Sequence, residues 1–578
     1  MTAVLNFKSH LSDLFAEALR TVAPEQAATI LLERPKQAQH GDYSCNLAMQ
    51  LAKPLRRSPR DIAQALMAAL PASGVVEKVE IAGTGFINVF LTVAAKQSVV
   101  RGVLQAGAGY GHIRRGAGKK VQVEFVSANP TGPLHVGHGR GAAYGASLSN
   151  VLDAAGYAVT REFYVNDAGR QMDILALSTW LRYLALHGIS VPFPPNAYQG
   201  AYVRDMAQQI SAAHGARYVR AAAEAMHSAP SVEEDADAHL DALIANCKKL
   251  LGEDYAYIHN HVLTEQLGDC RNDLAEFGVH FDEWFSEQSL FDSGLVARAV
   301  DTLKHGGHLY QQDGALWFRS TTFGDEKDRV VQRENGLYTY FASDIAYHLN
   351  KFERGFDRVI NIWGADHHGY IARVNGALKA LGLDSDRLTI ALVQFAVLYR
   401  NGEKAAMSTR SGEFVTLREL RNEVGNDATR FFYVLRKSDQ HLDFDMDLAK
   451  SQSNENPVYY LQYAHARICS VLQQWQGDAA VLKQADVGVL ESDYEKVLLQ
   501  HLIDYPQVIE GAAEDLAPHL IAFYLKDLAA DFHSYYNASR FLVEDEKVKQ
   551  ARLALIAAVA QVMRNGLALL GVSAPEKM

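Results

Sequence analysis

The chain has 578 residues and a formal net charge of −11, with 48% hydrophobic and 21% charged residues. This length exceeds one ordinary domain and suits three or four, each large enough for its own core. The negative charge argues against a chain whose whole surface binds nucleic acid, because phosphate contacts draw on lysine and arginine, but it allows a local basic surface.

Signals for a membrane or for export are not found in the sequence. No run of about 18 apolar residues occurs, and the N-terminus lacks the charged, apolar and small-residue pattern of a secretion signal. The 4 cysteines are far apart and show no paired metal spacing, which favours buried, reduced thiols. We therefore expect a cytoplasmic protein without a membrane contact.

Residues 1–106 are predicted to form a first, mixed α and β unit. It opens with an amphipathic helix and ends in strand-like runs at 75–81 and 86–91. Residues 107–120 are rich in Gly, Arg and Lys, which predicts a linker.

A strand, a helix and a second strand are predicted between residues 121 and 165. Val121, Val123 and Phe125 alternate with polar residues, which is typical of a strand. Apolar residues recur at helical spacing from Val136 onward, and 157–165 has the pattern of a second strand. Such a βαβ unit has a right-handed crossover and a ligand crevice at the carboxyl ends of its strands.

His135 and His138 lie at that crevice, one turn apart at the predicted helix N-terminus. We expect both rings to reach one ligand and the free backbone N–H groups of the first turn to form an anion site. Gly137 would let a flat ring lie on the backbone. The Lys-Ser/Thr pair of a P-loop is missing. The alternative is that the two histidines only cap the helix at the surface.

Residues from about 170 to 290 are predicted to be largely helical, and we assign them no chemistry. A buried strand at 358–363 is followed by Gly364 and Asp366. A glycine at a strand end followed by an acid suits a ribose, because the backbone can approach closely and the carboxylate accepts from the hydroxyls. The alternative is a metal site formed by Asp366 with the two histidines that follow it.

A further strand is predicted at 388–395, followed by a loop at 401–412. From 416 to the end the pattern is helical throughout. Tyr459 and Tyr463, together with His465 and Arg467, offer stacking faces and charge for unpaired bases. The alternative is a bundle core with tyrosines at its rim.

His135-Val136-Gly137-His138 resembles the HIGH signature of the class I aminoacyl-tRNA synthetases, and residues 124–132 look like the arginine-specific members. The resemblance implies an α/β fold: a Rossmann-type parallel-sheet catalytic domain at 121–415 with a helical insertion at about 170–290. It also implies a small α+β N-terminal domain at 1–106 that contacts the tRNA D-loop, and an all-α anticodon-binding bundle at 416–578.

The implied activity is arginine–tRNA ligation by a monomer that binds L-arginine, ATP with Mg²⁺, and tRNA(Arg). Arginine is activated to arginyl-adenylate, in a step that family members usually make dependent on tRNA, and is then transferred to the 3′-terminal adenosine. No resident metal is implied.

The resemblance also implies three groups of site residues. They are an ATP site at Pro133, His135, Gly137, His138, Gly364, Asp366, His367, Met407 and Ser408; an arginine pocket at Glu124, Ser127, Asn129, Tyr340, Asp344 and Asp366; and tRNA contacts at Phe86, Asn88, Tyr459, Tyr463 and Arg467. Carboxylates suit an arginine pocket, because a guanidinium has five donors and no acceptor. Without the resemblance, Phe86 is equally well a core residue and Asn88 a turn residue.

The loop at 401–412 resembles the KMSKS loop, but Ala406 and Thr409 occupy the places of its two lysines. The cation that stabilises the leaving pyrophosphate must then come from another residue. We expect Arg410 to supply it, with Lys404 as the second candidate, so that both join the two histidines as catalytic residues.

Three alternatives follow from these departures. Another class I synthetase would share the histidines and the nucleotide fold. A non-catalytic paralogue would bind tRNA and charge nothing. A metal phosphoesterase would use the Asp-His-His run.

Overall fold

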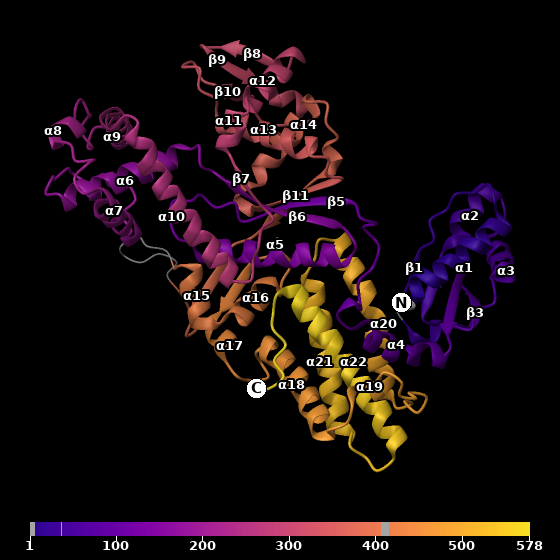
Figure 1. Ribbon diagram of the computed structural model, residues 1–578. Helices are drawn as coiled ribbons and strands as arrows, with labels where there is room; N and C mark the ends of the chain where they lie inside the picture. The colour runs from indigo at the N-terminus through magenta and orange to yellow at the C-terminus, as the bar shows by residue number, and fades with distance from the viewer. Residues whose placement is uncertain (1–5, 36, 406–414) are drawn as a thin grey trace.

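The computed structural model describes residues 6–35, 37–405 and 415–578. Met407, Ser408 and Arg410 therefore lie outside the described residues. Figure 1 shows an N-terminal unit to one side, a central sheet flanked by a helical insertion and an upper layer, and a helical bundle below.

The N-terminal unit packs three helices against an antiparallel sheet in the order β1-β2-β4-β3. A fourth helix, α4, leads away from it and packs on the C-terminal bundle. The elements are α1 (Phe7–Val22), β1 (Leu32–Glu33), β2 (Tyr43–Cys45), α2 (Leu47–Leu55), α3 (Pro59–Ala69), β3 (Val76–Ala82), β4 (Phe86–Leu91) and α4 (Val93–Ala106).

The central sheet is parallel throughout, in the order β12-β11-β5-β6-β7. The predicted βαβ unit is confirmed as β5, α5 and β6. The strands and α5 are β5 (Lys120–Glu124), α5 (Val136–Ala154), β6 (Ala158–Val165), β7 (Glu283–Ser286), β11 (Arg358–Gly364) and β12 (Leu388–Val393).

Gln122 and Glu124 are buried along with Val121 and Val123, because β5 is the middle strand of a sheet covered on both faces. The alternation that identified this strand therefore does not mark a solvent face.

A helical insertion separates β6 from β7, as the sequence predicts, and consists of α6 (Arg170–Leu186), α7 (Ala201–His214), α8 (Ala222–Ala225), α9 (Ala236–Leu251) and α10 (Asp254–Glu276). The structure corrects its end: β7 lies within the stretch expected to be insertion, yet it pairs with β6.

An upper layer follows β7 and carries a small antiparallel sheet in the order β10-β9-β8. Its elements are α11 (Gln288–Asp292), α12 (Leu295–His305), β8 (Leu309–Gln312), β9 (Ala315–Phe318), β10 (Arg329–Gln332), α13 (Tyr340–Glu353) and α14 (Ile371–Ala380).

The chain after β12 is not helical throughout, contrary to the expectation from residue 416 onward. β15 (Leu442–Asp445) pairs in parallel with β13 (Ala396–Arg400), and β14 (Glu403–Lys404) completes that sheet. The alternating exposure of β15 was too short to outweigh the surrounding helical periodicity. The helices α15 (Leu417–Val424) and α16 (Asn426–Val434) lie between β14 and β15, and α17 (Met446–Lys450) follows β15.

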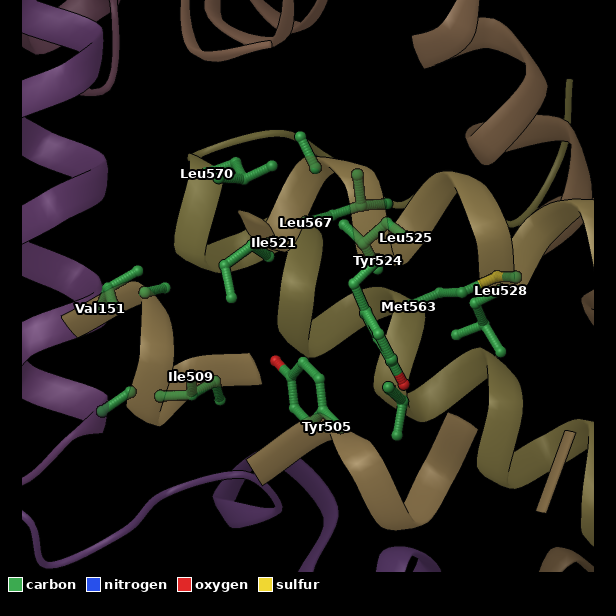
Figure 2. Packing of buried hydrophobic residues seen from close by; sticks show 14 of the residues in the cluster. Val151, Tyr505, Ile509, Ile521, Tyr524, Leu525, Leu528, Met563, Leu567 and Leu570 are labelled. Atoms are coloured by element: carbon green, nitrogen blue, oxygen red, sulfur yellow. The ribbon is translucent and has the colours of Figure 1, made fainter. Parts of the chain in front are cut away.

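The C-terminal bundle consists of α18 (Pro457–Trp475), α19 (Ala479–Leu482), α20 (Asp493–Glu514), α21 (His519–Ala538) and α22 (Glu546–Leu570). Its core is continuous with the catalytic domain: Figure 2 shows Val151 of α5 beside Ile509 of α20 and Ile521 of α21. Among the described residues, α22 alone has the length and hydropathy of a membrane span, and 67% of that apolar window is buried. This burial is typical of a core helix.

Arg430 joins three parts of the chain without an ion pair. Its buried guanidinium on α16 donates to the carbonyls of Leu570 (2.9 Å) at the end of α22 and of Phe277 (2.8 Å) after α10. Burial lowers the pKa of Arg430 to about 10, so the group stays charged at neutral pH.

Replacing Arg430 with methionine should destabilise the junction between catalytic domain and bundle by about 3 kcal/mol, since buried carbonyls lose charged donors. The first urea unfolding transition measures the loss. The matched control is Arg436→Met, which removes an exposed arginine and should cost less than about 0.5 kcal/mol. Equal losses in the two variants would contradict this role.

Candidate active site at the carboxyl edge of the sheet

The two histidines form a reciprocal cap at the start of α5. His135 is the N-cap residue; its Nδ1 accepts from the Gly137 amide (3.1 Å), and Nδ1 of His138 accepts from the His135 amide (3.3 Å). The rings stack with centroids 3.7 Å apart. Because each Nδ1 is an acceptor, a neutral ring carries its proton on Nε2.

Burial lowers the pKa of both histidines, and that of His138 falls to about 3. Each charged ring would also repel the other. Both imidazoles are therefore neutral at physiological pH, and each offers an Nε2–H donor without a positive charge.

The predicted anion site of free backbone N–H groups is wrong. The Val136 amide donates to the Val415 carbonyl (3.1 Å), the Gly137 amide to His135, and the His138 amide to the His135 carbonyl (2.9 Å). A sequence cannot reveal this, because Val415 comes from a distant part of the chain. The donors that this turn offers a ligand are its side chains.

Gly137 and Gly364 lie on either side of one aromatic ring that the sequence analysis missed. A Cβ at Gly137 would come within 2.8 Å of the His135 ring and 3.2 Å of Phe395, and one at Gly364 would lie 3.6 Å from Phe395. Phe395 follows β12 and is 46% exposed. The sequence signal that could have identified Phe395 is an aromatic residue at the carboxyl end of a predicted sheet strand.

The remaining predicted ATP residues are at the surface of the same edge. Pro133, Asp366 and His367 are exposed, and His367 Nε2 lies 3.5 Å from an Asp366 carboxylate oxygen. The described residues contain no group of three His, Cys, Asp or Glu side chains that could hold a metal ion.

Glu124, at the end of β5, is 7% exposed and held on both oxygens. Its Oε1 accepts from Ser127 Oγ (2.8 Å) and its Oε2 from Lys351 Nζ (2.6 Å). Ser127 Oγ also accepts from the Tyr164 amide (3.1 Å). Val126 and Ser127 both have left-handed backbones, with φ of 67° and 43°, which is strained for Val126.

Two more acids face this region without a cation of their own. Asp344 lies on the first turns of α13, and Glu287 lies just after β7. Glu287 Oε1 accepts from Ser343 Oγ (2.7 Å), whereas its buried Oε2 has no hydrogen-bond partner among the described residues. Neither forms an ion pair with any described residue.

Burial raises the pKa of Asp344 to about 7, and the charges of Glu124 and Glu287 add to the rise. Burial also raises the pKa of Glu287. The sequence analysis missed Glu287 because β7 was assigned to the insertion; as the residue after a sheet strand it would have been a candidate.

Asn129 and Tyr340 are exposed at the rim of this pocket. Asn129 Oδ1 accepts from Asn166 (3.2 Å), which follows β6. Tyr340 begins α13, one turn before Asp344.

The segment before residues 406–414 pairs within the β13–β14 sheet, and the segment after them bonds to the chain around the two histidines. Lys404 is exposed on β14. Beyond the gap, Val415 accepts from Val136, and the Leu417 amide donates to the Leu134 carbonyl (2.8 Å). The KMSKS-like segment therefore leads directly into the chain that pairs with the two histidines.

In the N-terminal unit, Phe86 and Asn88 differ in accessibility. Phe86 begins β4 and is 39% exposed, so the alternative that it is a core residue is wrong. Asn88 is 5% exposed, and its Oδ1 accepts from Ser44 (2.9 Å). It is a strand residue rather than a turn residue, and its amide is engaged within the sheet.

On the bundle, three of the predicted residues share one face of α18. Tyr459 stacks with Tyr463 at 6.1 Å between centroids, and Arg467 lies 5.0 Å from the Tyr463 ring. His533 and Tyr536 of α21 join this face, because Arg467 contacts both. Tyr459 also lines an open groove of about 520 Å³ with Met578. His465 is fully buried, so it offers no stacking face.

Comparison with known proteins gives the same organisation. The family models described as "Arginyl tRNA synthetase N terminal domain", "tRNA synthetases class I (R), catalytic domain" and "DALR anticodon binding domain" match residues 9–91, 99–196 with 246–450, and 461–578. The curated "Arginine--tRNA ligase" of Nitrosospira multiformis is 70% identical over 575 residues, covering 99% of each chain.

Solved structures agree with these matches. The Thermus thermophilus arginyl-tRNA synthetase is 25% identical, with a TM-score of 0.73 over 99% of this chain and 100% of that one. The crystal structure of a "putative arginyl t-RNA synthetase" from Campylobacter jejuni is 32% identical, with a TM-score of 0.74 over 84% of this chain and 100% of that one. The predicted fold class is confirmed, and the alternative functions are not favoured. The chain therefore belongs to the arginyl-tRNA synthetases, the class I ligases that join arginine to tRNA using ATP.

Proposed function

We propose that arginine is activated between the histidine turn of α5 and the pocket formed by Glu124, Glu287 and Asp344. The observation that carries this assignment is the pair Asp344 and Glu287: a half-buried and a buried carboxylate that no described cation neutralises. A guanidinium supplies one positive charge and a planar fork of donors for both.

Specificity follows from the cost of leaving those acids unpaired. An amino acid with an apolar or anionic side chain would close the pocket over buried carboxylates, which costs several kcal/mol. Lysine supplies charge without the planar fork and fills part of the geometry only. We assign the α-ammonium of arginine to Glu124, Ser127 and Asn129, with Tyr340 at the rim.

In the first step an oxygen of the arginine carboxylate attacks the α-phosphorus of ATP. A C–O–P anhydride forms, the bond between the α-phosphorus and its bridging oxygen breaks, and pyrophosphate leaves with the electron pair. No protein atom forms a covalent bond, so His135 and His138 act by positioning and by Nε2–H donation to oxygens on which charge develops. Gly137, Gly364 and Phe395 accept the flat adenosine, Pro133 and His367 border it, and Asp366 lies beside the ribose and the arginine.

In the second step the terminal 2′-hydroxyl of tRNA(Arg) attacks the arginyl carbonyl. An ester forms, AMP leaves, and the hydroxyl proton passes to solvent or phosphate. Phe86 of the N-terminal unit and the face of Tyr459, Tyr463 and Arg467 provide stacking and charge for unpaired bases. We assign Asn88 a supporting place in that strand.

The cation that stabilises the leaving pyrophosphate is assigned to Arg410, with Lys404 as second candidate and Met407 and Ser408 beside the phosphates. The described residues offer no three-ligand metal cluster, so Mg²⁺ is proposed to arrive bound to the phosphates of ATP, whose charge it reduces. We further propose a cytoplasmic monomer, without a membrane contact, whose first step requires bound tRNA.

Arginine binding should strengthen as pH rises, because the guanidinium binds the ionised form of Asp344, whose pKa is raised to about 7. We expect the KM for arginine to fall about tenfold between about pH 6 and 8, with the KM for ATP unchanged. In Asp344→Asn this dependence should disappear while the KM itself rises. A flat profile in the unmodified protein would contradict the assignment of Asp344.

Replacing His138 with alanine removes one donor to the developing charge and should lower kcat by about 10² to 10³ with little change in the KM for arginine. The control is His305→Ala at the exposed end of α12, expected within about twofold of the unmodified kcat. If His138→Ala raised only the KM values, the histidine would bind ground state and transition state equally.

The two candidate cations can be separated by pyrophosphate exchange with tRNA present. Arg410→Ala should slow exchange by a factor corresponding to about 2.7 to 4 kcal/mol, and Lys404→Ala should change it less. If Arg410→Ala stays within about threefold of the unmodified rate while Lys404→Ala is slow, the roles are reversed.

A further inference from the structure

A fully buried lysine lies behind the arginine pocket. Lys351, on the last turn of α13, has no exposed surface. Its Nζ donates to Glu124 Oε2 (2.6 Å) and Asn361 Oδ1 (2.7 Å) and lies 4.2 Å from the Tyr347 ring centroid. These three contacts fix the ammonium group in one place. The sequence analysis assigned this residue no role.

A chain of hydrogen bonds connects Lys351, through Asn361 and His348, to the backbone of Asp344. Asn361 Nδ2 donates to His348 Nε2 (2.8 Å), and His348 Nδ1 donates to the backbone carbonyl of Asp344 (2.8 Å). Asn361 is also paired in register with Glu124 on the neighbouring strand. One network therefore connects the acid at the end of β5 with the turn that carries the other acid.

The charges near the pocket are unevenly matched by the protein. Buried Glu162 is neutralised by Arg354 (2.7 Å) and Glu124 by Lys351, whereas Glu287 and Asp344 have no internal cation among the described residues. Arginine brings a guanidinium and an α-ammonium. With Lys351 in place, each of the three pocket acids has one cationic group to face, while the carboxylate of arginine is directed to ATP.

We propose that Lys351 is a positioning residue that supplies the counter-charge of Glu124 and aims its Oε1 at the α-ammonium of arginine. This proposal rests on the proposed function of Glu124. A carboxylate buried as deeply as Glu124 favours its protonated form unless a cation lies against it. Because Lys351 occupies Oε2, the other oxygen faces Ser127 and the pocket.

Several polar and charged side chains surround Lys351 and Glu124, each from an element that packs against them. They are Tyr347 and His348 from α13, Asn361 from β11, Tyr164 from β6, Ser127 after β5, and the acids Asp344 and Glu287. Burial and the charge of Lys351 lower the pKa of His348 to about 3, and burial raises the pKa of Tyr347 well above its usual value. Burial raises the pKa of both acids, Asp344 and Glu287.

Two ligands separate the effect of Lys351 and Glu124 on binding from the effect of Asp344 and Glu287. L-arginine and 5-guanidinopentanoate share the guanidinium and the carboxylate, and only arginine has the α-ammonium. Changes at Asp344 or Glu287 affect both ligands alike, so they cancel in the ratio of their inhibition or dissociation constants. That ratio, called here the ammonium preference, reports on Glu124.

In Lys351→Met we expect the ammonium preference to fall at least tenfold at pH 7, with 5-guanidinopentanoate affinity within threefold of the unmodified protein. An unchanged preference would overturn the proposal, and so would an equal fall in the affinity for both ligands, which a merely structural lysine would give.

Two further variants separate the possible failures. Glu124→Gln should lose the preference at every pH; if it does not, the proposed function of Glu124 is wrong. If Glu124→Gln loses the preference and Lys351→Met keeps it, only the inference on Lys351 is wrong. The double variant removes both charges and should melt at a higher temperature than Lys351→Met, while its preference stays low and independent of pH.

The unmodified protein provides a test that needs no variant. If the contact with Lys351 fixes the α-ammonium site, the ammonium preference should vary by less than twofold between pH 6 and 8, although the affinity for each ligand rises with Asp344 ionisation. A preference that rises with pH in step with those affinities would overturn the proposal even if Lys351→Met failed to fold.

Discussion

Three carboxylates, those of Glu124, Glu162 and Glu287, are buried near one edge of the central sheet, and Asp344 is half-buried beside them. The described part of the protein supplies cations for Glu124 and Glu162, so a positively charged ligand favours the ionised forms of the other two. The rest of the site is arranged around this imbalance. Parallel strands bring Glu124 and Glu287 to the same edge, and α13 adds Asp344 from above.

The side of the site that we propose binds ATP works by the opposite means. Its two imidazoles are neutral, and the amides of the first helical turn are already bonded within the protein. Fixed neutral donors can follow a phosphate whose charge moves during the reaction without holding the starting state too tightly. Permanent charge is kept for the amino acid, where it discriminates, and neutral donors serve the nucleotide.

Much of this organisation could be predicted from the sequence. The βαβ unit, the strand at 358–363 and the two histidines were each recognised from periodicity and turn chemistry, because these signals are local. What failed depended on pairing between distant segments. Glu287 was missed because a four-residue strand inside a helical stretch carries little periodicity, and only its pairing with β6 reveals it. Lys351 looked like an ordinary helix-end lysine, since burial depends on what packs above it.

The helix that begins at the histidines also belongs to the anticodon-binding bundle. Val151, near the other end of α5, lies in the continuous core that α5 shares with helices α20 and α22, so one helix supports both the catalytic domain and the bundle. The names of the domains suggest separable modules. The packing of α5 on the bundle shows instead that the catalytic domain and the bundle share one core. A catalytic fragment cut away before the bundle would expose an apolar helix face and loosen the support of its own nucleotide turn, so synthesis of the last helix completes the active site as much as it completes the tRNA-binding end.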